Sequence, residues 1–533
     1  MSAGLEAKPR EGERRDDEDL GRFRTAWWQR LIADASTYEL TRFAVLRLLA
    51  FVYLVAFISL AAQLEPLLGS RGLLPVAQFL DFIGTRLGAD AHWRFPTLFW
   101  LGASDGALRA ACWAGVVLSA AALFGATNAL LQLALWVLYM SFVHVGQIFY
   151  AYGWETQLLE TGFLAVFLCP LTSARPWPRS ATPKVVVWLL RWLIFRVMVG
   201  AALIKLRNDP CWRDLTCLDY HFETQPNPNP FAWWLHRAPH WVHAAGVLFN
   251  HFVELVVPWF AFGFRRWRHL AGAFLVALQA FLIASGNLSF LNWLTIVPAL
   301  ACFDDTAFVR LMPSRLRAGM LARFEALAVA PRHATVTYVL GVVVGLLSVA
   351  PVMNLASCEQ AMNDSFDPFN LVNTYGAFGT VDRVRDEVIL EGTRDAEPDA
   401  GARWSEYELP CMPGDTRRRP CLVAPYHYRL DWQMWFVRGR QQQPIQREPW
   451  LVHLVWQLLE GDPAPKALLA RDPFPDSPPR WIRAAVWRYR FTRSRADGSW
   501  WTRERVEEYL DPVSVEDPDL RDYVRAYGWL NDE

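Results

Sequence analysis

Long apolar segments dominate the first two thirds of this chain and constrain its fold more than any other feature. A helix needs about 20 mainly apolar residues to cross the roughly 30 Å hydrocarbon core of a membrane. Segments that meet or approach this length are Phe43–Gln63, Leu108–Phe124, Ala129–Gly146, Val185–Ile204, Val242–Gly263, Leu270–Ser285 and Val336–Ala350. Shorter or more polar candidates are Trp154–Cys169 and Leu288–Phe303. A soluble helical core rarely contains so many, so the sequence predicts a polytopic α-helical membrane protein of about nine spans.

The positions of the basic residues predict how these spans are oriented. The segments rich in Lys and Arg are 1–35, 175–184, 265–268 and 310–332. Cytoplasmic loops of membrane proteins carry an excess of these residues. Nine spans with a cytoplasmic N-terminus place all four segments in the cytoplasm. The same count places the loop 205–241 and the C-terminal part of the chain outside the cytosol.

The sequence divides into three predicted parts. Residues 1–35 are polar and lack the apolar core of a cleavable signal peptide, so we expect a flexible cytoplasmic tail. Residues 36–352 form the predicted transmembrane domain. Residues 353–533 are rich in charged, aromatic and turn-forming side chains, which indicates an extracytosolic domain, lumenal or periplasmic according to the host.

The C-terminal part carries several strand signals. An Asp-Gly turn within 496–498 separates the alternating segments Arg488–Thr492 and Trp500–Val506, which predicts a β-hairpin. Glu406–Cys411 and Cys421–Phe436 also alternate as strands do, whereas Leu451–Glu460 has helical spacing. We therefore expect a β-rich domain with minor helices.

The cysteines support the predicted orientation. Those in segments predicted to lie outside the cytosol are Cys211, Cys217, Cys358, Cys411 and Cys421. Such compartments favour disulfide bonds. Cys411 and Cys421 flank a Pro-Gly-Asp turn and form a candidate disulfide. Cys211 pairs with Cys217, or one of the two pairs with Cys358; free thiols are the alternative.

Several charged or titratable residues fall within or beside the predicted spans. They are Glu155, Glu160, Arg191, Arg196, Lys205, His251 and Glu254. Each Arg or Lys near a span centre costs about 2.5–3.5 kcal/mol, so these groups should face protein or water. One interpretation is an intramembrane polar cluster of interhelical ion pairs, such as Glu160 with Arg191 or Arg196. The other is a polar chamber that relays protons or performs acid/base chemistry.

Other classes of protein are disfavoured. With 53 Lys+Arg and 53 Asp+Glu the chain has no net charge, which argues against a general nucleic-acid binder. The sequence contains no P-loop, no HExxH and no GxSxG motif, and no cofactor is predicted. The spacing of His236, His240 and His243 is compatible with metal ligation. Loop histidines near a membrane surface are commoner than metal ligands, however, and no metal site is predicted.

Six motifs resemble signatures of the lipase maturation factor family. They are Gly153–Pro170, Arg191–Pro230, Asn250–Trp259, Ser285–Asp305, Asn373–Gly379 (NTYGAFG) and Pro420–Phe436. The resemblance implies an endoplasmic reticulum membrane protein with a lumenal C-terminal part, or an inner-membrane protein if the source is bacterial. It further implies a folding and maturation factor whose partners are membrane lipids and a secreted, dimeric, lipase-like client. No catalytic residue carries over, and the oligomeric state is left open.

A shorter similarity suggests a second hypothesis. Gly200–Leu206 (GAALIKL) is similar to the segment of vitamin K-dependent gamma-carboxylase that carries its active lysine, which places Lys205 in that role. A desolvated lysine can act as a base. The alternative function is therefore a membrane-embedded acid/base enzyme that uses Lys205, His251 and Glu254. A proton-coupled transporter is a weaker third class, because the sequence shows no inverted repeat.

Overall fold

Every apolar segment that the sequence marks as a span forms a helix in the computed structural model, which describes residues 36–175, 180–310, 312–438 and 445–530. The predicted tail lies outside these residues. The helices of the apolar segments are α2 (Glu39–Leu68), α5 (Asp105–Leu123), α6 (Ala129–Val145), α7 (Gly153–Leu168), α8 (Lys184–Asn208), α12 (His240–His251), α13 (Arg265–Ser285), α14 (Leu291–Ala299), α17 (Pro331–Leu347) and α18 (Val349–Ala356). The shorter connecting helices are α3 (Val76–Leu87), α4 (Asp90–Arg94), η1 (Leu98–Leu101), η2 (Gln147–Tyr150), α9 (Pro210–Arg213), α10 (Cys217–Thr224), α11 (Pro230–His236), η5 (Leu300–Cys302), α15 (Asp305–Val309) and α16 (Ser314–Glu325).

Six helical segments of the described chain are long and apolar enough to cross a membrane. They are Glu39–Leu68, Asp105–Leu123, Lys184–Asn208, His240–Phe262, Arg265–Ser285 and Pro331–Ala356. The predicted multi-span helical region is therefore confirmed. Because α6, α7 and α14 are shorter than 18 residues, the count of nine spans stays a prediction. The boundary predicted at residue 352 falls inside α18 and also stays a prediction.

The helical region is organised around two apolar helices. α2 and α8 are the most buried of the candidate spans, whereas α5 and α17 lie more to the outside. A side-chain cap starts several helices: Ser104 accepts from the backbone N–H of Ala107 in α5, and Asn128 accepts from that of Leu131 in α6. Packing then determines which helices are central.

The span His240–Phe262 changes its hydrogen-bonding pattern partway. After α12 it continues as a π-helical turn, η3 (Phe252–Val256), and a 3₁₀ helix, η4 (Val257–Phe262). Pro258 has no backbone N–H and cannot continue an α-helical ladder. The irregular turn places Glu254 on the inner side of the span, where it is buried.

The outer domain (residues 385–530, as described) contains one four-stranded antiparallel sheet in the order β2-β1-β3-β4. Its strands are β1 (Arg385–Thr393), β2 (Ser405–Glu406), β3 (Trp481–Phe491) and β4 (Trp501–Val513). Its helices are α19 (Arg429–Arg438), η6 (Ile445–Arg447), α20 (Pro449–Glu460), α21 (Pro463–Lys466) and α22 (Pro518–Ala526). The pairing of β3 with β4 confirms the hairpin, and α20 confirms the helix expected at 451–460.

Two strand predictions in the outer domain are wrong. Glu406–Cys411 contributes only its first residue to β2, and the end of Cys421–Phe436 lies in α19. Residues 429–434 of α19 are all buried. A helix that is buried on all sides lacks the polar face that identifies a helix in a sequence, which explains the second error.

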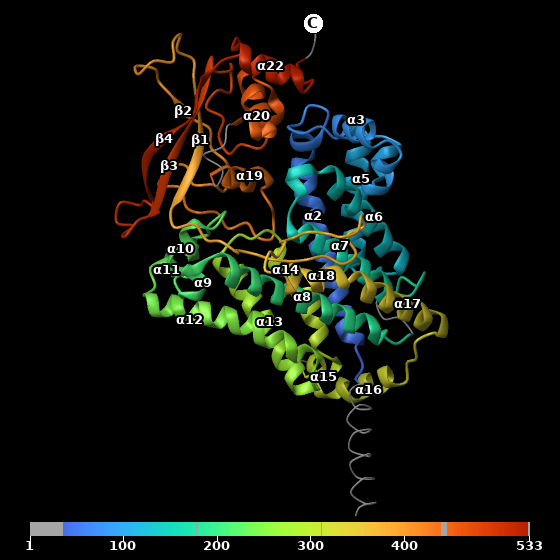
Figure 1. Ribbon diagram of the computed structural model, residues 1–533. Coiled ribbons are helices and arrows are strands. Elements are labelled where there is room, and N and C mark those ends of the chain that lie inside the picture. Colours follow the sequence, from blue (N-terminus) through green and yellow to red (C-terminus); the bar gives the residue numbers. More distant parts are fainter. Residues whose placement is uncertain (1–35, 176–179, 311, 439–444, 531–533) are drawn as a thin grey trace, which may run out of the picture.

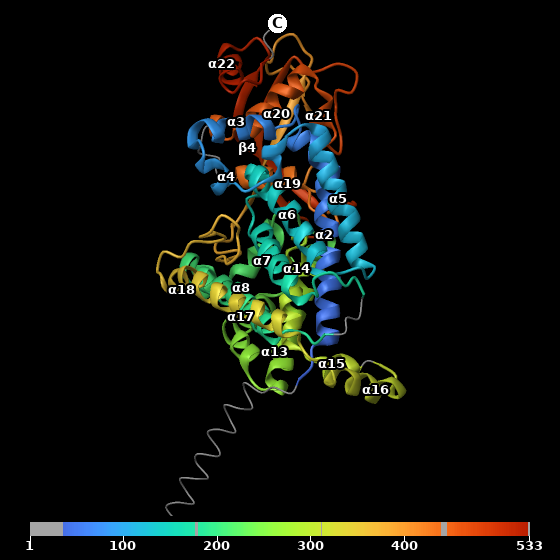
Figure 2. The ribbon, with the colours of Figure 1, turned by 90° about the vertical axis from the view of Figure 1, so that its right-hand side faces the viewer.

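The outer domain sits on one end of the helical body, and α15 and α16 lie at the opposite end (Figures 1 and 2). Residues 357–384, here called the strap, cross between the body and the outer domain (Figure 1). A second contact joins α20 of the outer domain to the helical body. The ring of His453 stacks on Trp529, and its Nδ1 atom lies 2.9 Å from the Leu73 carbonyl oxygen. Gln457 donates to the carbonyl of Arg71 at 2.9 Å.

The burial of His453 predicts that the stability of the folded protein depends on pH. Burial lowers the pKa of His453 to about 4, whereas an unfolded histidine titrates near 6.5. The unfolded chain therefore binds an additional proton below pH 6.5. The contribution of His453 to the free energy of unfolding is fully present above that pH. It falls by up to roughly 3 kcal/mol as the pH drops toward 4.

We expect His453→Gln to flatten this profile, measured as the unfolding temperature of the purified protein between pH 7.5 and 4.5. His240→Gln is the matched control, because the side chain of His240 is 59% exposed. An unchanged slope in His453→Gln would contradict the prediction.

Candidate functional site

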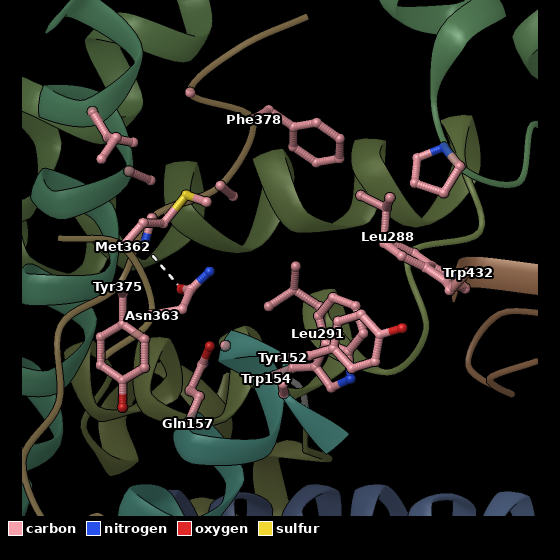
Figure 3. Close-up of a pocket in the computed structure, with 18 of the residues that line it drawn as sticks. Tyr152, Trp154, Gln157, Leu288, Leu291, Met362, Asn363, Tyr375, Phe378 and Trp432 are labelled. Carbon is pink, nitrogen blue, oxygen red and sulfur yellow. Dashed lines mark hydrogen bonds between the residues drawn. The ribbon is translucent and has the colours of Figure 1, made fainter. Parts of the chain in front are cut away.

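A cavity of about 560 Å³ lies where the helical body, the strap and the outer domain meet (Figure 3). We call it the junction cavity. Its volume is within the roughly 300–1,000 Å³ of typical ligand pockets. The body contributes Tyr152, Trp154, Gln157, Leu288 and Leu291; the strap contributes Met362, Asn363, Tyr375 and Phe378; and α19 contributes Trp432, Gln433, Trp435 and Phe436. The cavity thus exists only when three distant parts of the chain come together.

One wall of the junction cavity is aromatic. Tyr152 stacks on Trp154 with ring centroids 4.4 Å apart, and Trp154 meets Trp432 edge-to-face at 5.0 Å. Gln433 holds the wall in place by donating to the Tyr152 hydroxyl at 2.7 Å. Trp435 donates through Nε1 to the Thr224 carbonyl at 3.0 Å. Fixed aromatic side chains of this kind offer large apolar contact area at little entropic cost.

The strap is anchored to a buried ion pair inside the helical body. Glu160 of α7 pairs with Arg196 of α8. The backbone N–H of Asn373 and the hydroxyl of Tyr375 donate to Glu160 at 3.1 and 2.7 Å. Arg196 donates to the Asn373 carbonyl at 2.6 Å. The NTYGAFG motif is therefore positioned by the charges that the sequence places in the spans.

Close backbone approach completes the attachment of the strap. A Cβ atom added at Gly200 of α8 would lie 2.4 Å from the Tyr375 carbonyl oxygen. Glycine is required there because a larger residue would collide with the backbone of the strap.

The second carboxylate on α7 connects to the outer domain. Glu155 lies 2.9 Å from Arg429 of α19, and both side chains are fully buried. Trp154 donates to Glu155 through Nε1 at 3.1 Å, and the Tyr139 hydroxyl also donates to it. Arg429 in turn donates to the Phe149 carbonyl at 2.5 Å. Sequence reasoning missed Arg429, because nothing local marks a residue 274 positions away as the partner of Glu155.

The four residues predicted as an intramembrane polar cluster are thus divided among separate networks. Of the two pairings considered for Glu160, the structure contains the one with Arg196. Arg191 instead donates to the Ala301 carbonyl at 2.8 Å and to the Tyr38 hydroxyl at 2.9 Å. Each network is consistent with a structural role for these charges.

The residues of the enzyme hypothesis are only partly brought together. Lys205 lies 2.6 Å from Glu254 and 3.3 Å from the Asn250 side-chain oxygen. Asn250 donates to the other Glu254 oxygen at 2.9 Å. His251 turns away, with Nε2 2.9 Å from the Trp212 carbonyl oxygen. This arrangement does not align His251 with the Lys205–Glu254 pair.

The structure also places the cysteines of the segments that the sequence predicts to be extracytosolic. Disulfides join Cys411 to Cys421 and Cys211 to Cys217, and Cys358 is free and exposed. Cys211 and Cys217 form, with Asp209, a group of the described chain close enough to hold a metal. The two sulfurs form a disulfide bond, and Asp209 forms an ion pair with Arg383 at 2.8 Å. In this state the three side chains are used by the protein itself and not as metal ligands.

The loop at the C-terminal disulfide is held by Asp431 of α19. Its carboxylate accepts from the backbone N–H groups of Cys411 and Met412 at 2.6 and 3.0 Å. Burial raises the pKa of Asp431 to about 7 even though these hydrogen bonds oppose the shift. The disulfide loop therefore rests on the same helix that lines the junction cavity.

These observations define a class of protein: a multi-span helical membrane protein with a C-terminal domain built on a four-stranded antiparallel sheet. Comparison with known proteins identifies the family. The lipase maturation factor transmembrane domain matches residues 40–310, and the lipase maturation factor C-terminal domain matches residues 371–511. The chain belongs to the lipase maturation factor family, which confirms the resemblance seen in its motifs.

Its similarity to individual members extends over nearly the whole chain. It is 49% identical over 522 residues to lipase maturation factor 1 of Bos taurus, covering 93% of this chain and 92% of that protein. It is 46% identical to lipase maturation factor 1 of Homo sapiens, with 92% and 91% covered. Identity to human lipase maturation factor 2 is 31%, with 92% and 85% covered. No solved structure matches the chain.

The buried pair Glu155–Arg429 yields a stability prediction. Arg429→Leu leaves the Glu155 carboxylate buried without its partner, and removal of one member of a buried pair costs about 3–5 kcal/mol. We expect a clearly lower unfolding temperature for the purified protein. The double variant Glu155→Gln with Arg429→Leu should recover part of the loss.

Arg71→Leu is the control for this prediction. Arg71 pairs with Asp462 at 2.7 Å, but its side chain is 69% exposed. Exposed pairs contribute about 0–1 kcal/mol. Equal unfolding temperatures for Arg429→Leu and Arg71→Leu would contradict the prediction that the buried pair Glu155–Arg429 stabilises the fold.

Proposed function

We propose that this membrane protein assists the folding and assembly of secreted lipase-like clients. The family supports the proposal, since the most similar relatives described above are named lipase maturation factor 1. The single structural observation that carries it is the junction cavity, an aromatic site at the base of the extramembrane domain. An aromatic, partly apolar site can hold apolar side chains that a partly folded client has not yet buried.

The proposed location is the endoplasmic reticulum membrane, or the inner membrane in a bacterial host, with the outer domain on the extracytosolic side. Disulfides Cys211–Cys217 and Cys411–Cys421 both support an oxidising compartment on that side. Arg265 at the start of α13 contacts Asp304 next to α15, at the end of the body far from the outer domain. Basic residues at that end fit a cytoplasmic face.

The size of the cavity indicates the kind of contact. About 560 Å³ accommodates a few side chains rather than a folded partner. Contacts that bury little area are weak and transient, as a factor that must release its client requires. A polar group of the lining, the half-buried Asn363, can pair with the backbone of an extended client segment. We infer that a client enters as a short apolar segment and leaves when its own core forms.

The proposal can be tested in cells that secrete a lipase only when this protein is present. Met362 lines the junction cavity and is 48% exposed, so Met362→Asp places a charge at the cavity without removing a buried side chain. A carboxylate opposes entry of apolar groups by a few kcal/mol. We expect the secreted lipase activity per amount of lipase protein to fall about tenfold at an equal level of the membrane protein.

Leu422→Asp is the matched control. Leu422 is 68% exposed on the outer domain and does not line the junction cavity. This variant should support lipase secretion as the unchanged protein does. Full secretion of active lipase with Met362→Asp would refute a role for the cavity in client maturation.

A further inference from the structure

A second cavity, of about 450 Å³, lies within the helical body between α8, α10, α12, α13 and α14. We call it the body cavity. Its lining is mostly apolar, with Leu278 and Leu282 of α13 among its walls. Phe378 of the strap lines both this cavity and the junction cavity and thus lies between them.

The body cavity opens toward the outer surface of the helices. Ala245 and Phe249 of α12 and Phe281 of α13 line it and are at the same time exposed on the protein surface. Phe249 and Phe281 are large apolar side chains that would contact lipid in a membrane. A ligand that enters between α12 and α13 would therefore come from the membrane.

The polar wall of the body cavity carries no net formal charge. Lys205 and Glu254, which both line it, form a close ion pair at 2.6 Å, and Asn250 bridges the two. Their hydrogen bonds to one another leave no uncompensated charge to attract an ion. An ionised ligand would lose its hydration without gaining a counter-charge, which is costly in a low-dielectric site.

One polar side chain in this cavity lacks a partner. His221 of α10 is 7% exposed and lies edge-on to Phe378, with ring centroids 4.9 Å apart. No hydrogen bond joins its ring nitrogens to another residue of the described part of the chain, and they are not among the fully enclosed unpaired atoms, which agrees with a side chain that lines the cavity. Burial and the nearby Lys205 lower its pKa to about 4, so the imidazole is neutral and offers one donor and one acceptor.

An unpartnered buried imidazole is uncommon. Nearly all buried polar groups in proteins are hydrogen-bonded, and one left without a partner costs about as much as a lost hydrogen bond. A ligand group that supplies the missing bond would recover this free energy. The apolar walls would contribute the remaining affinity through burial of hydrocarbon.

From this geometry we propose that the body cavity binds an uncharged, single-chain lipid. Its acyl chain lies along Leu278 and Leu282, and its hydroxyl or ester group forms a hydrogen bond with His221. A monoacylglycerol has this chemistry, whereas an ionised fatty acid lacks a counter-charge in the wall. This site adjoins the junction cavity, but the proposal does not depend on the client contact proposed there.

Binding can be measured with the purified full-length protein in nanodiscs and radiolabelled 1-monooleoylglycerol as the probe. We expect saturable binding of one molecule per chain, and oleate at pH 8.5 should bind at least tenfold more weakly. His221→Phe keeps the ring but removes the hydrogen bond, and it should weaken monooleoylglycerol binding about tenfold. Ala245→Trp fills the opening and should abolish saturable binding.

Leu248→Trp is the matched control, because Leu248 is exposed on the same helix but does not line the body cavity. It should bind the probe as the unchanged protein does. Unfolding temperatures verify that each variant is folded, and a folded Ala245→Trp or His221→Phe suffices for the test. Absence of saturable binding, undiminished binding by these folded variants, or equal binding of oleate would each overturn the proposal.

Discussion

Two buried carboxylates on α7 hold the strap and the outer domain against the helical body. Glu160 pairs with Arg196 and accepts hydrogen bonds from the strap, while Glu155 pairs with Arg429 of the outer domain. Both acids are withdrawn from water, so each requires an opposite charge and several donors around it. Arginine meets this need, because its planar guanidinium presents several donors at once.

These buried ion pairs position the segments that line the two cavities. Because the strap is held against α8 and α19 is held against α7, aromatic side chains of residues 152–154, of the strap and of α19 face one another in the junction cavity. Phe378 lines both this cavity and the body cavity, and its φ of 53° is uncommon for a residue with a bulky side chain. Trp212 fixes that backbone by donating to the Phe378 carbonyl at 2.8 Å.

The candidate site could be predicted only in part from the sequence, and its residues show why. Glu160 and Arg196 stand out because charges are rare in apolar helices, and that signal needs no knowledge of the fold. Lys205 and Glu254 stand out for the same reason, but only adjacency along the chain groups His251 with them, and in the structure it faces Trp212. Neighbouring residues on a helix point in different directions, so adjacency does not place side chains together. The aromatic wall carried no signal, since a tryptophan in a core and one in a cavity look alike in a sequence.

The sequence by itself determined the helical membrane region, the β3–β4 hairpin, the helix α20 and the family. These features depend on local composition, on the Asp-Gly turn and on long motifs, all of which are written in consecutive residues. Only the tertiary structure decided that Arg429 meets Glu155, that residues 429–438 are helical and that His221 faces a cavity. Each of these results from packing between segments far apart in the chain, and the free energy of such contacts has no counterpart in the order of neighbouring residues.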